Sequence, residues 1–124
     1  MNKSSEASRE RVVNFTELFE RAEKDRELVQ VLLEIFKEDF PRYHVSLKEA
    51  VARKDAKQVE VVAHSMKGML LNMAARRAAD LLGRLEKAAR EGDQSSLKES
   101  LGLFENEVSG LLPELETYLE EVRG

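Results

Sequence analysis

One histidine, His64, is followed at short and fixed spacing by a cation and a glycine. Lys67 comes three residues later and Gly68 four residues later, so a helix would place both about one turn from the imidazole. Neutral imidazole is a good nucleophile near pH 7. A lysine ammonium can offset the negative charge of an added phosphoryl group. These residue types at this spacing therefore indicate phosphoryl acceptance on the ring of His64.

Gly68 is expected in the middle of a helix, where glycine is unfavourable by about 1 kcal/mol relative to alanine. One explanation is that the missing side chain lets the surface of another protein approach His64. The other is that Gly68 only relieves crowding against a neighbouring helix.

The helix that must hold His64 is predicted from Asp55, its capping residue, to about Ala75. Successive residues advance by about 100° around a helix, which separates two faces. The apolar stripe opposite His64 consists of Val59, Val62, Met66, Met69 and Met73. The face of His64 itself holds Glu60, Val61, Lys67, Gly68 and Leu71. We expect His64 to point to solvent, with Glu60, Val61, Gly68 and Leu71 forming a surface on which a partner docks. His44 lacks this spacing and is assigned a structural role at the surface.

The remaining helices follow from apolar spacing and capping residues. A short helix begins near Val12, and Asp25 caps a longer one. The buried stripe predicted for that longer helix is Leu28, Val31, Leu32, Ile35 and Phe36. Pro41 predicts a kink or a short break near Asp39 and Phe40.

Two further helices complete the chain. One carries Leu81, Leu82 and Leu85 and ends at Gly92. The last is expected to start with a capping box at Ser96, although Asp93 is also a candidate cap for it, and to bend at Pro113. Short connections favour antiparallel neighbours. The prediction is an all-α fold, an up-and-down four-helix bundle with an additional short N-terminal helix. Residues 1–11 are interpreted as a flexible tail or linker and residues 12–124 as the bundle.

Composition excludes several classes of function. The 124 residues carry 20 basic and 24 acidic side chains, a net charge of −4, and the signs alternate along the chain. No segment is basic enough to follow a nucleic-acid backbone. There is no cysteine, so thiolate metal sites and disulfides are excluded. No apolar run approaches the roughly 20 residues that cross a bilayer. We expect a cytoplasmic protein without membrane insertion.

The segment His64-Ser65-Met66-Lys67-Gly68 resembles the signature of histidine-containing phosphotransfer (HPt) domains. In that signature a phosphorylatable His is followed by any residue, an apolar residue, Lys and Gly. The likeness extends over roughly residues 25 to 119. Its other parts are Phe36, Asp39 and Pro41, then Leu47, Ala50 and Asp55, then Asn72-Met73-Ala74-Ala75, and finally the Leu-Glu, Ala-Arg and Gly-Asp pairs within residues 85–93.

The resemblance implies a histidine phosphotransfer protein that relays a phosphoryl group between receiver-domain aspartates through Nε2 of His64. Lys67 would assist the electrostatics of the phosphate, and Gly68 would permit docking. The partners would be receiver domains of response regulators or hybrid histidine kinases, and the chain would be a monomer. Mg²⁺ would be supplied by the partner receiver, so no metal site and no cofactor are expected here. The chain would carry phosphate without ATP-dependent kinase activity of its own.

Two other functions compete with this one. The alternative that the sequence leaves open is a phosphorylation-silent HPt-like module that only docks a receiver or regulator. Leu71 mildly favours it, because a smaller residue is more usual there in the family. The second is the dimerising phosphoacceptor domain of a histidine kinase, which normally has an acidic residue directly after its His. Ser65 does not fit that pattern, and the sequence has no Gly-rich nucleotide-binding segment.

Overall fold

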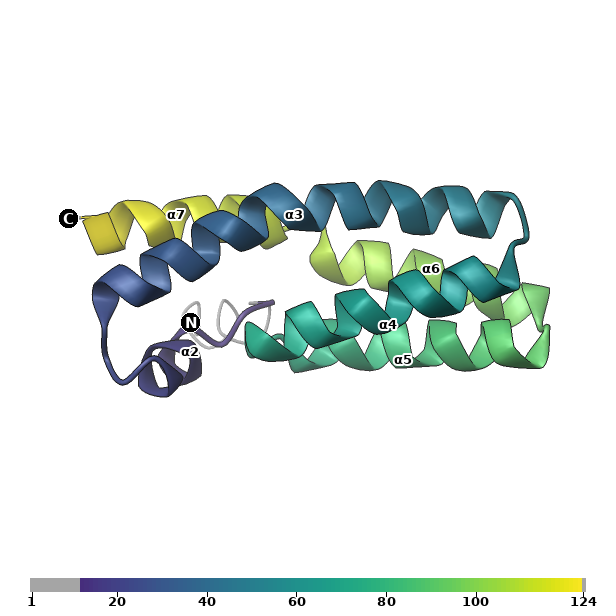
Figure 1. Cartoon of the computed structure of the whole chain (residues 1–124), viewed down its shortest axis with the longest axis horizontal. Helices are drawn as coiled ribbons and strands as arrows, with labels where there is room; N and C mark the ends of the chain where they lie inside the picture. The colour runs from purple at the N-terminus through teal and green to yellow at the C-terminus, as the bar shows by residue number, and fades with distance from the viewer. Residues whose placement is uncertain (1–11, 124) are drawn as a thin grey trace, which may run out of the picture.

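The computed structural model describes residues 12–123, and within that range it consists of helices joined by short turns, with no strand. The predicted all-α class is therefore confirmed for this part of the chain. The predicted tail, residues 1–11, lies outside the described residues. The helices, numbered as in Figure 1, are α2 (Phe15–Arg21), α3 (Arg26–Ala52), α4 (Ala56–Asn72), α5 (Arg76–Glu91), α6 (Gln94–Val108) and α7 (Leu111–Arg123).

The long helix α3 runs along one side of the molecule, and α2, α4, α5 and α6 lie beneath it in the view of Figure 1. α4 returns alongside the second half of α3, and α5 and α6 follow in alternating directions. α7 continues beyond α6 and lies beside the first half of α3. Among the described helices, α4 and α5 share the most extensive contact. None of the described helices is both long and apolar enough to span a bilayer.

Side-chain caps start α3 and α4 where the sequence predicts. Asp25 accepts a hydrogen bond from the backbone N–H of Leu28, and Asp55 accepts one from Gln58, both at 3.1 Å. Gly92 ends α5 in the left-handed conformation, at φ 69°. The capping box predicted at Ser96 is wrong. Asp93 is the N-cap of α6, and Ser96 donates its own N–H to that carboxylate.

The two prolines have different effects: the change of direction in α3 agrees with the kink predicted near Pro41, whereas the bend predicted at Pro113 is not found. No break occurs at Pro41, because α3 continues through it as one helix whose axis changes direction about midway (Figure 1). The helix loses only the hydrogen bond that an N–H at Pro41 would make. The predicted last helix is interrupted at Ser109 and Gly110 rather than bent at Pro113. Pro113 lies in the first turn of α7, where backbone N–H groups have no partner within the helix anyway.

The stripe predicted to be buried on α3 is largely wrong. Phe36 is buried, but Leu28, Val31, Leu32 and Ile35 are exposed by 38–54%. The core contacts come instead from a second set on the same helix, Val29, Leu33, Phe36 and Phe40. Apolar residues occupy more than half of the circumference here, and period alone does not say which part faces the core. The outer set leaves an apolar stripe on the surface of α3, called the α3 stripe below.

His44 ties α3 to α6. Its ring contacts the rings of both Phe40 and Phe104, and its Nε2 atom is 2.9 Å from Oε2 of Glu105. The side chain is 24% exposed. These contacts are those of a residue that joins two helices at the edge of the core.

Candidate functional site

α4 places His64 on its outer side, as predicted. Val59, Val62, Met66 and Met73 face the core, while Met69 is only partly buried. Ala63, directly before His64, is fully buried, and the side chain of His64 is 73% exposed. A helix clamped on one face by the core thus holds the imidazole rigidly at the surface.

A carboxylate from the neighbouring helix lies under this imidazole. Glu86 of α5 is buried, and its Oε2 atom is 3.1 Å from Nδ1 of His64. The other oxygen, Oε1, is 2.7 Å from Nζ of Lys67. One carboxylate therefore bridges the imidazole and the ammonium, which are one helical turn apart on α4.

Burial raises the pKa of Glu86, but the hydrogen bonds from Lys67 and His64 outweigh burial and lower the pKa below its ordinary value of 4.5. Glu86 is consequently ionised at neutral pH. An ionised carboxylate can only accept hydrogen bonds. Nδ1 of His64 must then be the donor, which leaves the lone pair of a neutral ring on Nε2.

The predicted site residues around His64 take up different surroundings on α4. Val61 and Leu71 are exposed by 50% and 43%. Glu60 is partly covered and pairs with Arg90 of α5, with Oε2 3.2 Å from Nη1. Lys67 is one-third exposed because its stem lies along the surface towards Glu86.

Gly68 is exposed, and a Cβ atom built on it would meet no atom of another residue within 4 Å. Crowding against a neighbouring helix, one of the two explanations for this glycine, is therefore not its cause. The space above Gly68 is open to solvent.

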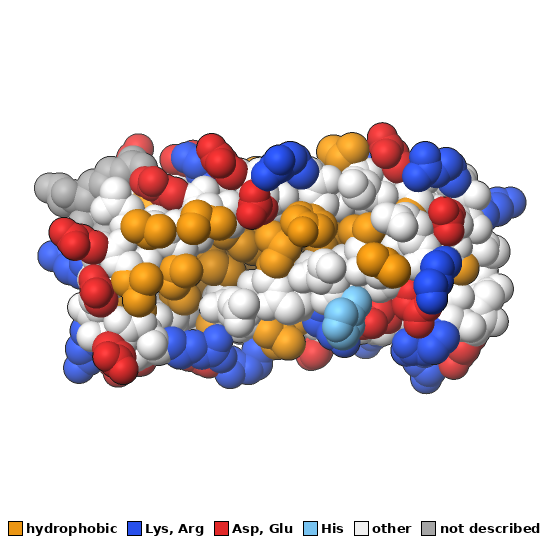
Figure 2. Space-filling view, in the orientation of Figure 1, with side chains coloured by type: hydrophobic (Ala, Val, Ile, Leu, Met, Phe, Trp, Pro, Cys, Tyr) orange, Lys and Arg blue, Asp and Glu red, His pale blue; other side chains and the backbone are white. Residues whose placement is uncertain are grey.

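A larger apolar surface lies beside this face. Figure 2 shows hydrophobic side chains gathered over the first half of α3 and the adjoining part of α4, with a histidine over α4 on the same side of the molecule. Between the two helices runs a groove of about 430 Å³. Its apolar walls include two members of the α3 stripe, Leu32 and Ile35, together with Met69 and Met73. Arg21 and Asp39 supply charge.

No cluster of three or more His, Asp or Glu side chains that could hold a metal ion occurs within residues 12–123. The expectation that Mg²⁺ comes from a partner stays a prediction. The chemistry available to the described residues is that of a nucleophilic imidazole held by a carboxylate next to a cation.

Glu86 is the member of this site that sequence reasoning missed, although the Leu85-Glu86 pair is part of the family likeness. A signal was present. Glu86 follows Leu82 by four residues and precedes Ala89 by three, so it lies in the buried stripe of α5. A carboxylate in such a stripe requires a charged or hydrogen-bonding partner. The sequence alone did not identify which residues of another helix would be the partners of Glu86.

Comparisons with known proteins show which family the chain resembles. The family model described as "Hpt domain" matches residues 31–124. The fold is similar to the crystal structure of histidine-containing phosphotransfer protein B from Pseudomonas aeruginosa PAO1, with a TM-score of 0.80 and 25% sequence identity. The alignment covers 89% of this chain and 96% of that one. No curated protein sequence matches. Because the family match covers most of the chain, the protein belongs to the Hpt domain family, the histidine phosphotransfer proteins of phosphorelays.

Proposed function

We propose that the protein relays a phosphoryl group between receiver-domain aspartates, with Nε2 of His64 as the atom that carries it. The observation that supports this most directly is the contact between Nδ1 of His64 and Glu86. It orients the ring, fixes the tautomer and leaves the nucleophilic nitrogen on a side chain that is 73% exposed. A carrier between two proteins needs such a rigid and accessible nucleophile.

The transfer step follows from the same contacts. The lone pair of Nε2 attacks the phosphorus of a receiver's aspartyl phosphate, the N–P bond forms, and the acyl phosphate P–O bond breaks to release the aspartate carboxylate. The ring becomes positively charged as it bonds to phosphorus, with a proton still on Nδ1. Glu86 would stabilise that charge, and Lys67 would offset the negative charge of the phosphoryl oxygens. The reverse reaction passes the group to the next receiver.

The docking surface in this proposal has two parts. The first is the predicted face of α4, formed by Glu60, Val61, Gly68 and Leu71. The second is the α3 stripe with the adjoining groove, because exposed apolar patches rimmed by charge are typical of protein-binding surfaces. The partners would be receiver domains of response regulators or hybrid histidine kinases, which would bring the Mg²⁺.

The proposal extends to the form of the protein. In this proposal helices α3 to α6 form an up-and-down four-helix bundle, and α2 is the additional short N-terminal helix. The protein acts as a monomer. The protein would be a phosphoryl carrier without ATP-dependent kinase activity of its own.

The test is transfer from a panel of phosphorylated receiver domains to the wild type and to His64→Gln. We expect an acid-labile, base-stable label on the wild type alone. The melting temperature of His64→Gln should stay within about 3 °C of the wild type, because exposed side chains contribute little to stability. Receiver binding without any label on the wild type would refute the carrier and favour the phosphorylation-silent docking module.

A further inference from the structure

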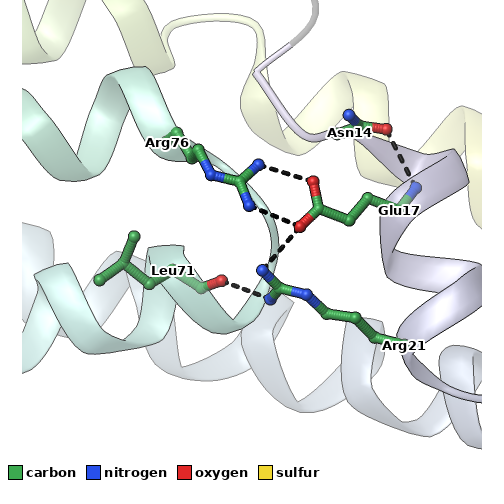
Figure 3. A network of polar contacts seen from close by, with 5 residues as sticks. All are labelled: Asn14, Glu17, Arg21, Leu71 and Arg76. Carbon is green, nitrogen blue, oxygen red and sulfur yellow. Dashed lines mark hydrogen bonds and ion pairs between the residues drawn. The ribbon is translucent and has the colours of Figure 1, made fainter.

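Helix α2 lies outside residues 31–124, which match the family model, yet it contacts both ends of the turn that follows the His64 helix. Figure 3 shows these contacts around Glu17. The carboxylate of Glu17 receives two hydrogen bonds of 2.6 Å from the guanidinium of Arg76, the first residue of α5. It receives a third, of 2.7 Å, from Nη2 of Arg21. One carboxylate on α2 thus holds two arginines.

Arg21 carries the contact on to α4. Its Nη1 atom donates a hydrogen bond of 2.8 Å to the backbone carbonyl of Leu71. That carbonyl belongs to the last turn of α4, where carbonyl groups lack partners within the helix. The positive charge also interacts favourably with the negative end of the helix dipole. Arg21 is therefore a C-terminal cap for α4, and Glu17 fixes its guanidinium in place.

The turn between α4 and α5 is closed by backbone hydrogen bonds from Ala74 to Leu71 and from Ala75 to Leu70, but two of its features are unfavourable. Ala74 adopts φ 57°, a left-handed conformation that is unfavourable for a residue with a Cβ atom. Ala75, the N-cap of α5, has no side chain that could cap the helix. α2 supplies support from outside, because the backbone N–H of Asn14 also donates to the carbonyl of Ala74 at 3.2 Å.

We propose that Glu17 is a positioning residue for receiver docking, acting through Arg21 to fix the last turn of α4 and the exposed side chain of Leu71. Leu71 stands two helical turns from His64 on the same face. This inference rests on the proposed function, because it assigns a purpose to the docking face of α4. We call the contacts of Glu17 and Arg21 with Arg76 and with the carbonyl of Leu71 the latch. The latch holds the last turn of α4 in the position in which a receiver binds it.

The first measurement is backbone hydrogen exchange in the wild type, Glu17→Gln and the matched control Glu20→Gln. Glu20 lies on the same helix, and its side chain is 61% exposed. Its Oε2 atom is 4.0 Å from Nζ of Lys24, a longer contact than those of Glu17. We expect exchange at Ala74 and Ala75, whose N–H groups bond to Leu71 and Leu70, to accelerate roughly two- to tenfold in Glu17→Gln only. Unchanged exchange would overturn the latch whether or not His64 carries phosphate.

The second measurement separates docking from chemistry. The KM for a phosphorylated receiver, or the Kd for the unphosphorylated one, should rise roughly two- to tenfold in Glu17→Gln, with kcat unchanged. Labelling of His64 by phosphoramidate, which needs no docking, should keep the wild-type rate. Failure of the wild type to take label from either donor would refute the proposed carrier, and the Kd would then decide the latch.

The variant Arg21→Gln distinguishes the latch from direct contact, since Arg21 also lines the groove. If the latch holds, Arg21→Gln and Glu17→Gln raise KM by similar factors, and the double variant adds nothing further. If Arg21→Gln raises KM while Glu17→Gln leaves it unchanged, Arg21 contacts the receiver itself and the latch is overturned. Should Glu17→Gln fail to fold, Glu17→Asp, with its shorter side chain, carries the same measurements.

Discussion

The Nδ1 atom of His64 lies 3.1 Å from Oε2 of Glu86, a buried carboxylate on the next helix. Because the other oxygen of Glu86 is 2.7 Å from Lys67, the carboxylate aligns a nucleophile and a cation that the helix alone would leave free to rotate. The reactivity of His64 should therefore depend on a residue that is itself largely buried.

Replacing Glu86 by alanine should slow the labelling of His64 by phosphoramidate roughly 10- to 100-fold. The loss corresponds to a hydrogen bond to a charged group, about 1.5–3 kcal/mol. Glu86→Gln keeps an acceptor for Nδ1 and should lose less. Exposed Glu99 of α6 provides the control, since Glu99→Ala should label at the wild-type rate. A Glu86→Ala protein that is folded and labels as fast as the wild type would contradict the role of this carboxylate.

The contrast between His64 and Glu86 shows how far the sequence could predict the site. The orientation of His64 follows from the period of one helix, whose apolar stripe is clear and whose start is marked by Asp55. The contact with Glu86 depends on how α4 and α5 are rotated relative to each other. That rotation is set by packing between helices distant along the chain, which no single-helix pattern encodes.

α3 is the opposite case, because the apolar spacing of its sequence predicts the wrong buried face. Leu28, Val31, Leu32 and Ile35 have the spacing of a core stripe but lie at the surface. The core instead takes Val29, Leu33 and Phe40 from the neighbouring side of the helix. A helix that is apolar over two faces is typical of one that meets both its own core and a partner, and only the packing tells the two faces apart.

Gly68 should separate docking from helix stability. Gly68→Ala should raise the free energy of unfolding by up to about 1 kcal/mol, because a Cβ there meets nothing and alanine is the better helix former. Gly68→Gln should slow transfer from a receiver while leaving labelling by phosphoramidate unchanged. The measurements are chemical denaturation and the two labelling rates. Receiver transfer at the wild-type rate in Gly68→Gln would remove the docking role of this glycine.

Leu71 and Leu103 form a matched pair for testing the docking face. Their exposed fractions are 43% and 42%, but Leu71 is on α4 beside the His64 face and Leu103 is on α6. Leu71→Ser should raise the KM for a phosphorylated receiver roughly threefold or more, because serine removes apolar contact area. Leu103→Ser should leave KM unchanged. Equal effects of the two substitutions would indicate a general loss of surface hydrophobicity rather than a defined docking site.

The hydrogen bonds and the charge of Arg76, together with smaller contributions from Arg21, lower the pKa of Glu17 from 4.5 to about 2, against the opposing effect of desolvation. A pKa that is lower in the folded state than in the unfolded state stabilises the fold fully above pH 4.5, and this stabilisation is lost as the pH falls from 4.5 towards 2. The melting temperature of Glu17→Gln should therefore lie below that of the wild type by a constant amount between pH 5.5 and 7. In this range Glu17 is ionised in both the folded and the unfolded wild-type protein.

Below pH 4.5 this difference should shrink, and by pH 2 most of it should be lost, because about half of the wild-type Glu17 carboxyl groups are then protonated in the folded state. Glu86 also has a lowered pKa, but it is present in both proteins and cancels in the comparison. The measurement is thermal unfolding followed by circular dichroism over this pH range, with Glu20→Gln as the control that should show a smaller difference throughout. A difference that persisted undiminished at pH 2 would mean that Glu17 stabilises α2 by packing, and the charged latch around Arg21 and Arg76 would lose its basis.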